Sequence, residues 1–132
     1  MVERCELVEN SGAGVSATRS SNIHIKDSSF INNGTSTNGG AGISLNGDTQ
    51  YMRVRFNHIS DDHGVLYGIK AGYSSSLDST AHIFDNTVHG FGAGVALGSD
   101  SKGCEVENNN LRSNTACVTN DGMDNHVSNN LC

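Results

Sequence analysis

The sequence contains no proline and no tryptophan, and it is poor in charged and aromatic residues. Charged residues make up 17% and aromatic residues 5% of its 132 residues. This charge content is low for the surface of a helical protein, and no long stretch keeps the apolar period of an amphipathic helix. The scarcity of aromatic rings argues against a strong platform for stacking sugars. These absences favour a protein built from strands.

The charge and the apolar pattern also narrow the class of partner. The net charge of −6 argues against a nucleic-acid backbone as the main partner. No apolar run approaches the roughly 20 residues that a membrane-spanning helix needs. The stretch from Met1 to Glu6 is acidic and lacks the apolar core of a secretory signal. We therefore expect neither nucleic-acid binding nor membrane insertion, and this chain shows no signal peptide.

Short apolar pairs bounded by Gly, Asn, Ser and Asp are typical of many short strands joined by tight turns. In the stretch I-K-D-S-S-F-I-N-N, Ile25, Ser28, Phe30 and Asn33 stand at intervals that recur along the chain. The apolar anchors of the five copies are Ile25, Val54, Ile83, Val106 and Val127. Successive anchors lie at most 29 residues apart, a period that suits one turn of a solenoid.

A second signature, an apolar strand opened by glycine, follows each copy. Its versions are Gly14-Val15-Ser16-Ala17, Gly42-Ile43-Ser44-Leu45, Gly68-Ile69-Lys70-Ala71, Gly94-Val95-Ala96-Leu97 and the degenerate Ala116-Cys117-Val118-Thr119. Each turn then has three strands, and stacked turns pair by parallel hydrogen bonds about 4.8 Å apart. We predict an all-β fold, a parallel β-helix of about five coils, with one domain over residues 1–132.

The repeat also predicts which side chains are buried. Alternation along each strand turns eight apolar side chains inward, namely Ile25, Val54, Ile83, Val106, Phe30, Ile59, Val88 and Leu111. At the bend between the first two strands, we expect Asn57, Asn86 and Asn109 to stack in left-handed backbone geometry. Each amide would bond to the Asn of the turns above and below.

From about Cys5 to Cys132, this pattern resembles the right-handed parallel β-helix repeat of the pectate lyase-like superfamily. The resemblance implies a right-handed solenoid that acts on or binds polysaccharide as a lyase, glycoside hydrolase or epimerase. The alternative is a non-catalytic structural or adhesive solenoid, such as a segment of a phage tail fibre or surface protein. Either class implies an extracellular, virion or cell-surface location, and the fold alone does not choose between the two functions.

In the resembling enzymes, the loop before the glycine-opened strand flanks a sugar-binding cleft. The outward face of that strand forms the cleft floor, here predicted as Ser16, Ser44, Lys70, Ala96 and Val118. A polysaccharide lyase needs carboxylates, often with calcium, and a Lys or Arg base. The resemblance therefore implies Lys70, Asp61 and His63 as catalytic residues, with Asp61 and Asp62 as candidate calcium ligands. The alternatives are a strand-capping role for Asp62 and a surface ion pair between Lys70 and Asp61.

One outward column holds several titratable side chains, one residue before each anchor. Its members are His24, Arg53, His82, Glu105 and His126. Three histidines spread over five turns are not adjacent metal ligands, so the column favours a solvated sheet face over a metal site.

The four cysteines and the ends of the solenoid complete the expectations. Cys5, Cys104, Cys117 and Cys132 are all predicted on inward columns, either as two disulfides or as buried thiols. Cys104 and Cys117 belong to one turn and could face each other.

Open solenoid ends invite further strand pairing. We therefore expect a fragment of a longer solenoid, or a protomer whose ends are covered by flanking domains or by another copy.

Overall fold

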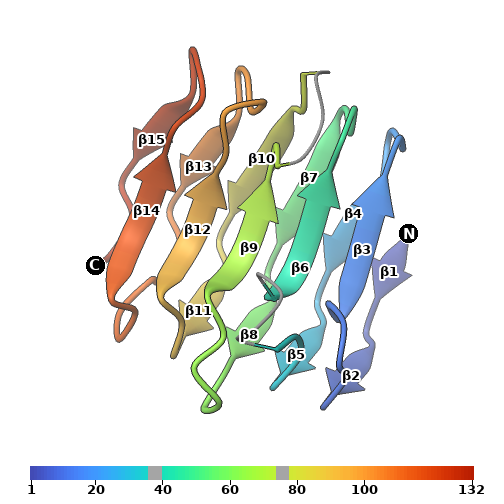
Figure 1. Ribbon diagram of the computed structural model, residues 1–132, viewed down its shortest axis with the longest axis vertical. Helices are drawn as coiled ribbons and strands as arrows, with labels where there is room; N and C mark the ends of the chain where they lie inside the picture. The colour runs from blue at the N-terminus through green and yellow to red at the C-terminus, as the bar shows by residue number, and fades with distance from the viewer. Residues whose placement is uncertain (36–39, 74–77) are drawn as a thin grey trace.

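The computed structural model describes residues 1–35, 40–73 and 78–132. All helices and strands defined in these residues are β-strands, β1 to β15, and none is a helix. The strands stack along one axis from the N-terminus to the C-terminus (Figure 1). All pairings between them are parallel. Strands β1 to β12 make four turns of three strands, and β13 to β15 continue the stack. The predicted parallel β-helix is confirmed.

Three sheets run along the solenoid. The first sheet contains β1 (Val2–Glu3), β4 (His24–Lys26), β7 (Met52–Arg55), β10 (Ala81–Phe84), β13 (Glu105–Glu107) and β15 (His126–Ser128). The second contains β2 (Glu6–Val8), β5 (Ser29–Ile31), β8 (His58–Ser60) and β11 (Thr87–His89). The third, made of the glycine-opened strands, contains β3 (Val15–Thr18), β6 (Ala41–Asn46), β9 (Tyr67–Ala71), β12 (Ala93–Leu97) and β14 (Ala116–Asn120).

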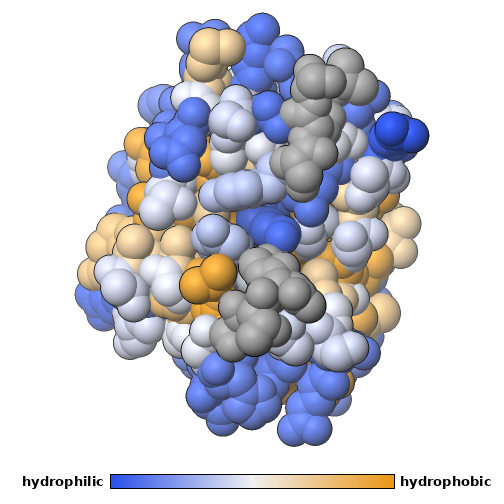
Figure 2. All heavy atoms as spheres, in the orientation of Figure 1, coloured by the Kyte–Doolittle hydropathy of each residue, from blue (hydrophilic) through white to orange (hydrophobic). Residues whose placement is uncertain are grey.

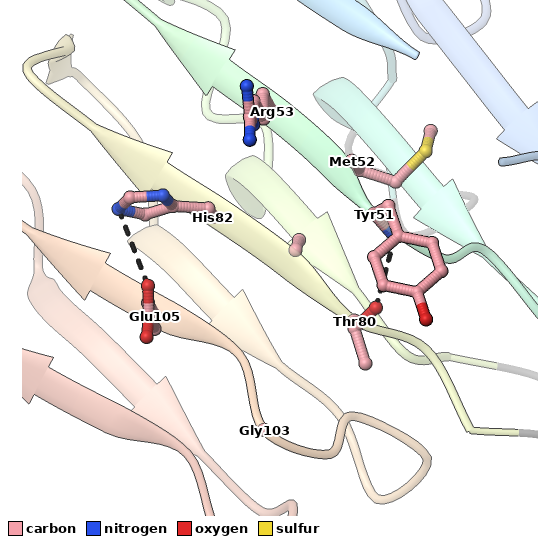
Figure 3. A pocket seen from close by; sticks show the side chains of 8 residues that line it. Tyr51, Met52, Arg53, Thr80, His82, Gly103 and Glu105 are labelled. Carbon is pink, nitrogen blue, oxygen red and sulfur yellow. Dashed lines mark hydrogen bonds and ion pairs between the residues drawn. The ribbon is translucent and has the colours of Figure 1, made fainter. Parts of the chain in front are cut away.

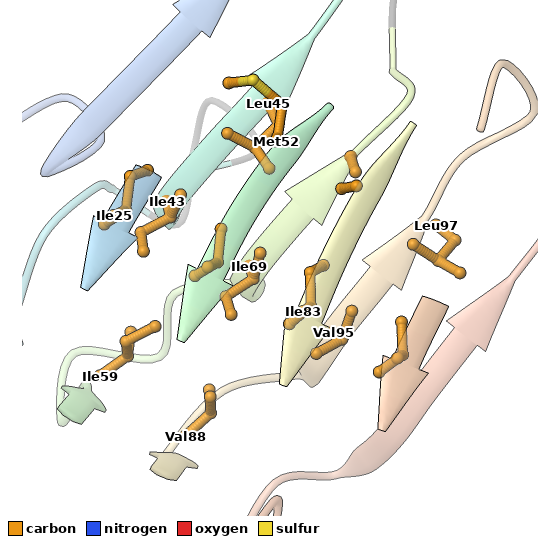
Figure 4. Close-up of a cluster of buried hydrophobic side chains, with 14 of the residues drawn as sticks. Ile25, Ile43, Leu45, Met52, Ile59, Ile69, Ile83, Val88, Val95 and Leu97 are labelled. Atoms are coloured by element: carbon orange, nitrogen blue, oxygen red, sulfur yellow. The ribbon is translucent and has the colours of Figure 1, made fainter. Parts of the chain in front are cut away.

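The core fills the space between the three sheets (Figure 4). The anchors pair in register, for example Ile25 with Val54 and Val54 with Ile83. All eight side chains predicted as core are buried, and Phe30 is wholly so. Burying a large apolar side chain contributes about 1.5–3 kcal/mol, so this column of stacked residues supplies much of the drive for folding.

Glycine opens the third-sheet strands because a side chain from the next turn packs against the backbone at that point. A Cβ on Gly14 would lie 2.7 Å from the Phe30 ring, and one on Gly42 would lie 2.6 Å from Ile59. Real Cβ atoms do not approach that closely, so glycine permits the second and third sheets to meet.

In the last version of this signature, the predicted register is wrong by one residue. Val118 pairs with Val95, and Thr119 pairs with Ala96. Val118 therefore points inward and packs against the core, and Thr119 takes the place on the outward face that was predicted for Val118. A slip of one residue exchanges the two faces of a strand, and no glycine marks the start of this one.

Cys117 occupies the glycine position of the last signature and forms a disulfide with Cys132. Leu131 pairs with Asn110, which places Cys132 in register with Leu111 on the second sheet. The cystine therefore joins the two positions that earlier turns fill with a glycine and an apolar side chain. The disulfide thus covalently joins two positions that only pack against each other in earlier turns, as Gly42 and Ile59 do.

The other two cysteines are free thiols, so the four cysteines form neither two disulfides nor four buried thiols, and the predicted facing of Cys104 and Cys117 is wrong. Cys104 is buried as predicted, and this burial raises the pKa of its thiol. The inward placement predicted for Cys5 is wrong. Cys5 stands at the asparagine corner of the first turn, where its backbone N–H donates to Ser28 Oγ at 3.1 Å, and it is exposed because only one neighbouring turn packs against it.

The asparagine corner is confirmed as a continuous ladder of buried amides. Nδ2 of Asn57 donates to the carbonyl of Ile25 at 3.0 Å and to Oδ1 of Asn86 at 3.0 Å. Nδ2 of Asn86 in turn donates to the carbonyl of Val54 at 2.8 Å and to Oδ1 of Asn109 at 3.0 Å. Each amide thus ties three successive turns together.

The left-handed geometry predicted for the ladder residues is wrong, because it belongs to the residue before each of them. The positive φ angles are 51° at Asp27, 54° at Phe56, 54° at Asp85 and 55° at Asn108. The preceding residue makes the bend, and the ladder asparagine makes the hydrogen bonds.

We expect replacement of Asn86 with Leu to destabilise the fold. The change removes the amide partners of Val54 and Asn57, and leaving buried polar groups without partners costs about 1–3 kcal/mol. Urea unfolding measures the loss, with Asn110→Leu, a change at an exposed asparagine, as the control. A midpoint for Asn86→Leu equal to that of the wild type would contradict the ladder.

We expect Cys132→Val to lower stability by about 2–4 kcal/mol, because it removes the cystine while keeping an apolar side chain in the place that Val88 fills elsewhere. Thermal unfolding of the oxidised protein measures the change. Cys5→Ser, a change at an exposed free thiol, should melt like the wild type. Equal melting temperatures for Cys132→Val and the oxidised wild type would show that the cystine does not stabilise the fold.

Candidate functional site

The outward face of the third sheet carries a groove. Ser16 pairs with Ser44, Ser44 with Lys70 and Lys70 with Ala96, as predicted for the cleft floor. The groove encloses about 420 Å³ and is lined by Ser11, Gly12, Ala13, Ser16, Thr35, Gly40, Ala41, Ser44 and Lys70. Ala96 is fully buried, so the open part of this face lies over β3, β6 and β9. Figure 2 shows this face, with hydrophilic side chains near its centre.

Lys70 is the basic side chain among the described residues that line the groove. Its neighbours Ile69 and Ala71 are fully buried, so alternation along β9 turns Lys70 outward. Its Nζ lies 6.0 Å from the centre of the Tyr67 ring. Partial burial lowers the pKa of Lys70 below its ordinary value. Losing water from around an ammonium group makes a nearby anion a stronger partner than it would be in bulk solvent.

The predicted acidic cluster is turned toward its own loop. Asp61 is buried, and its Oδ2 accepts hydrogen bonds from the backbone N–H groups of His63 at 3.1 Å and Val65 at 2.8 Å. Asp62 and His63 are exposed and pair with each other at 3.2 Å. Among the residues described as lining the groove, Lys70 is joined by serines, threonine, alanines and glycines, and neither Asp61 nor His63 is present. The catalytic roles of Lys70, Asp61 and His63 stay predictions.

The carboxylates of this loop do not fit a calcium site. Calcium takes six to eight oxygen ligands in proteins. Asp61 uses Oδ2 to hold its loop, its Oδ1 is buried without a hydrogen-bond partner, and Asp62 contacts His63, so the loop offers far fewer than six accessible oxygens. No group of three or more His, Cys, Asp or Glu side chains suited to a metal ion occurs in residues 1–35, 40–73 and 78–132.

The first sheet has a separate cavity on its outward face, which the sequence analysis missed. The predicted column is confirmed, since His24, Arg53, His82, Glu105 and His126 pair in register. A cavity of about 330 Å³ lies beside it, lined by Tyr51, Met52, Arg53, Thr80, Ala81, His82, Gly103 and Glu105 (Figure 3). The signal in the sequence was Tyr51, an aromatic residue at a corner where other turns have small or polar residues.

Within the described residues, no helix has the length and apolar character needed to span a membrane. A family model described as a right-handed β-helix region matches residues 1–132. A search of curated proteins found no match, and neither did a search of solved structures. The family match covers the whole chain and agrees with its stacked turns, whose strands form three parallel sheets. The chain therefore belongs to the right-handed β-helix family, in agreement with its resemblance to the pectate lyase-like superfamily.

Proposed function

We propose that the protein binds an acidic polysaccharide in the groove over β3, β6 and β9, with Lys70 facing a carboxylate of the sugar chain. The observation that carries this proposal is the partly desolvated Lys70 ammonium in a groove whose other described lining residues are small or bear hydroxyls. The right-handed β-helix fold is compatible with carbohydrate-active proteins and with structural solenoids.

The composition of the groove suits a hydroxyl-rich, negatively charged ligand. Glycine and alanine leave space above the strands, and the hydroxyls of Ser11, Ser16 and Thr35 can donate or accept hydrogen bonds. Lys70 supplies a positive charge to a protein whose net charge is −6. Because β3, β6 and β9 are adjacent strands, the groove crosses successive turns, and an extended sugar chain can follow the solenoid axis.

One observation favours binding without cleavage, as in an adhesive solenoid. The described lining of the groove contains no carboxylate, and Asp61 is committed to its own loop. A lyase reaction at this place would depend on Lys70 as the base, which must be neutral to accept the proton beside the uronate carboxylate. Such a reaction leaves a carbon–carbon double bond in the product, so ultraviolet absorbance separates cleavage from binding.

We expect Lys70→Ala to weaken binding of a polygalacturonate oligosaccharide about tenfold, which corresponds to about 1.4 kcal/mol. The fold should remain intact, because Lys70 points away from the core. Calorimetric titration measures the affinity, and thermal unfolding checks the fold. Lys102→Ala is the matched control, since Lys102 is an exposed lysine that pairs with Asp78 at 3.3 Å on another part of the surface. Undiminished affinity in Lys70→Ala would contradict the proposal.

The lowered pKa of Lys70 predicts how binding depends on pH. Burial makes its ammonium lose a proton at a lower pH than an ordinary lysine, whose pKa is 10.5. Binding that needs the charged form should therefore weaken before the pH reaches 10.5. Lys70→Arg should hold its affinity over the same range, because arginine stays charged. The proposal fails if affinity declines in the same way in the wild type and in Lys70→Arg.

A further inference from the structure

We propose that the outward face of the first sheet, at β7, β10 and β13, forms a second saccharide site that takes a uronic-acid oligosaccharide. In this site Arg53 holds a sugar carboxylate, Tyr51 packs against a sugar ring, and Glu105 and Thr80 bond to hydroxyl groups. The site lies on a different sheet from the Lys70 groove and does not depend on it.

The shape of the surface is the first argument. The cavity of about 330 Å³ extends over three adjacent turns, because Arg53 pairs with His82 and His82 pairs with Glu105. Figure 3 shows these three side chains on successive strands, with Tyr51 and Thr80 at one end of the cavity. Two strand spacings separate Arg53 from Glu105, roughly 10 Å along the solenoid axis. A ligand that reaches both is elongated along that axis.

The backbone of Tyr51 is the second argument. Its φ is 56°, and the residue is 69% exposed. In register with it stand Asn22, Thr80, Gly103 and Asp124, of which Asn22, Gly103 and Asp124 have positive φ angles of 56°, 63° and 55°. Asn, Gly and Asp tolerate left-handed geometry, whereas a bulky ring there is a strained exception. Little burial of the ring offsets that strain, and uncompensated strain of this kind is typical of functional positions.

Phe56 repeats the pattern at the other end of β7. It has a φ of 54°, is 51% exposed, and stands in register with Asp27 and Asp85. The guanidinium of Arg55 lies 5.5 Å from the Phe56 ring and 5.8 Å from the Phe84 ring. Exposed aromatic rings therefore flank both ends of β7, and Arg53 and Arg55 point outward between them.

The charged side chains around the cavity indicate the chemical class of its ligand. In the described residues, no hydrogen bond or ion pair involves the Arg53 guanidinium, which lines the cavity. The neighbouring charges are already engaged, since Lys26 pairs with Glu3 at 3.1 Å, and His82 contacts Glu107 at 2.9 Å and Glu105 at 3.6 Å. A carboxylate suits the planar fork of arginine, and the Glu105 side chain, which is 57% exposed beside His82, can accept further hydrogen bonds from hydroxyl donors. A chain with both carboxylates and hydroxyls meets these requirements, with the apolar face of a sugar ring against Tyr51.

The test uses the full chain carrying Lys70→Ala, so that binding in the groove on the third sheet is weakened about tenfold. Calorimetric titration with a polygalacturonate oligosaccharide measures the affinity of the remaining site. Adding Arg53→Ala should weaken binding about tenfold. Adding Arg112→Ala, which removes the same charge from an exposed position elsewhere, should leave the affinity unchanged. The same oligosaccharide with its carboxylates reduced to alcohols should bind about tenfold more weakly than the acid.

A second variant separates ligand binding from a role in the fold. Tyr51→Asn places at this corner the residue found at Asn22, so the melting temperature should stay level or rise while the affinity falls. A lower melting temperature with unchanged affinity would make Tyr51 structural and overturn the proposal. The proposal is also overturned by unchanged affinity in Arg53→Ala, by an equal loss in Arg112→Ala, or by full displacement of the oligosaccharide with equimolar sulfate.

The two sites can fail separately. If Arg53→Ala removes binding in the otherwise unaltered protein and Lys70→Ala does not, the second site stands and the proposed function of the groove fails. If Lys70→Ala removes all binding and Arg53→Ala changes nothing, the groove stands and the second site fails.

Discussion

The ladder of buried amides at the corner between the first and second sheets is the constraint on which the rest of the structure depends. Each amide hydrogen-bonds to the turn before it and the turn after it, so the corner cannot shift by one residue without breaking several bonds. Strands that start from a fixed corner keep their alternation in phase, and Ile25 and Phe30 stay stacked on their counterparts. The connections from the second sheet to the third differ in length from turn to turn.

Against this regular repeat, the candidate functional side chains lie where one turn departs from the pattern of the others. Lys70 is a charged residue in a column that otherwise holds small or hydroxyl-bearing residues. Tyr51 is an aromatic residue in a column of asparagine, aspartate, glycine and threonine. Both belong to the turn formed by β7, β8 and β9 and its preceding corner, yet they serve different sheets. The proposed functions place sugar chains on two faces of one solenoid.

The repeat allowed the fold and the core to be predicted from the sequence, because the spacing of the anchors and of the glycine-opened strands reflects the period of the strands themselves. The prediction failed where a position lost its usual marker. Val118 was assigned to the wrong face because Cys117 replaces the glycine that would have fixed the register. The bend was assigned to the ladder asparagines because tolerance of left-handed geometry and hydrogen bonding by the amide are separate properties, and adjacent residues divide them here.

The candidate sites were less predictable, because they depend on how loops and long side chains settle on a regular frame. Alternation alone placed Lys70 on the outward face, and the structure agrees. Sequence proximity also suggested that Asp61 would reach Lys70, but the backbone N–H groups of its own loop hold the carboxylate instead. The sequence predicted a solvated face beside Arg53, because the titratable residues of this column lack the spacing of metal ligands. The exposed aromatic corner became informative only once the φ of Tyr51 was known.

The most direct test of this account is the map of backbone amide chemical shifts as an acidic oligosaccharide is titrated into the isotopically labelled protein. The account predicts two clusters of shifted signals, one around Ser44 and Lys70 on the third sheet and one around Tyr51 and Arg53 on the first. The amides of Asn57 and Asn86 should stay in place, because the ladder holds the frame rigid. Shifts spread along the corner ladder, with none at Lys70 or Arg53, would contradict it.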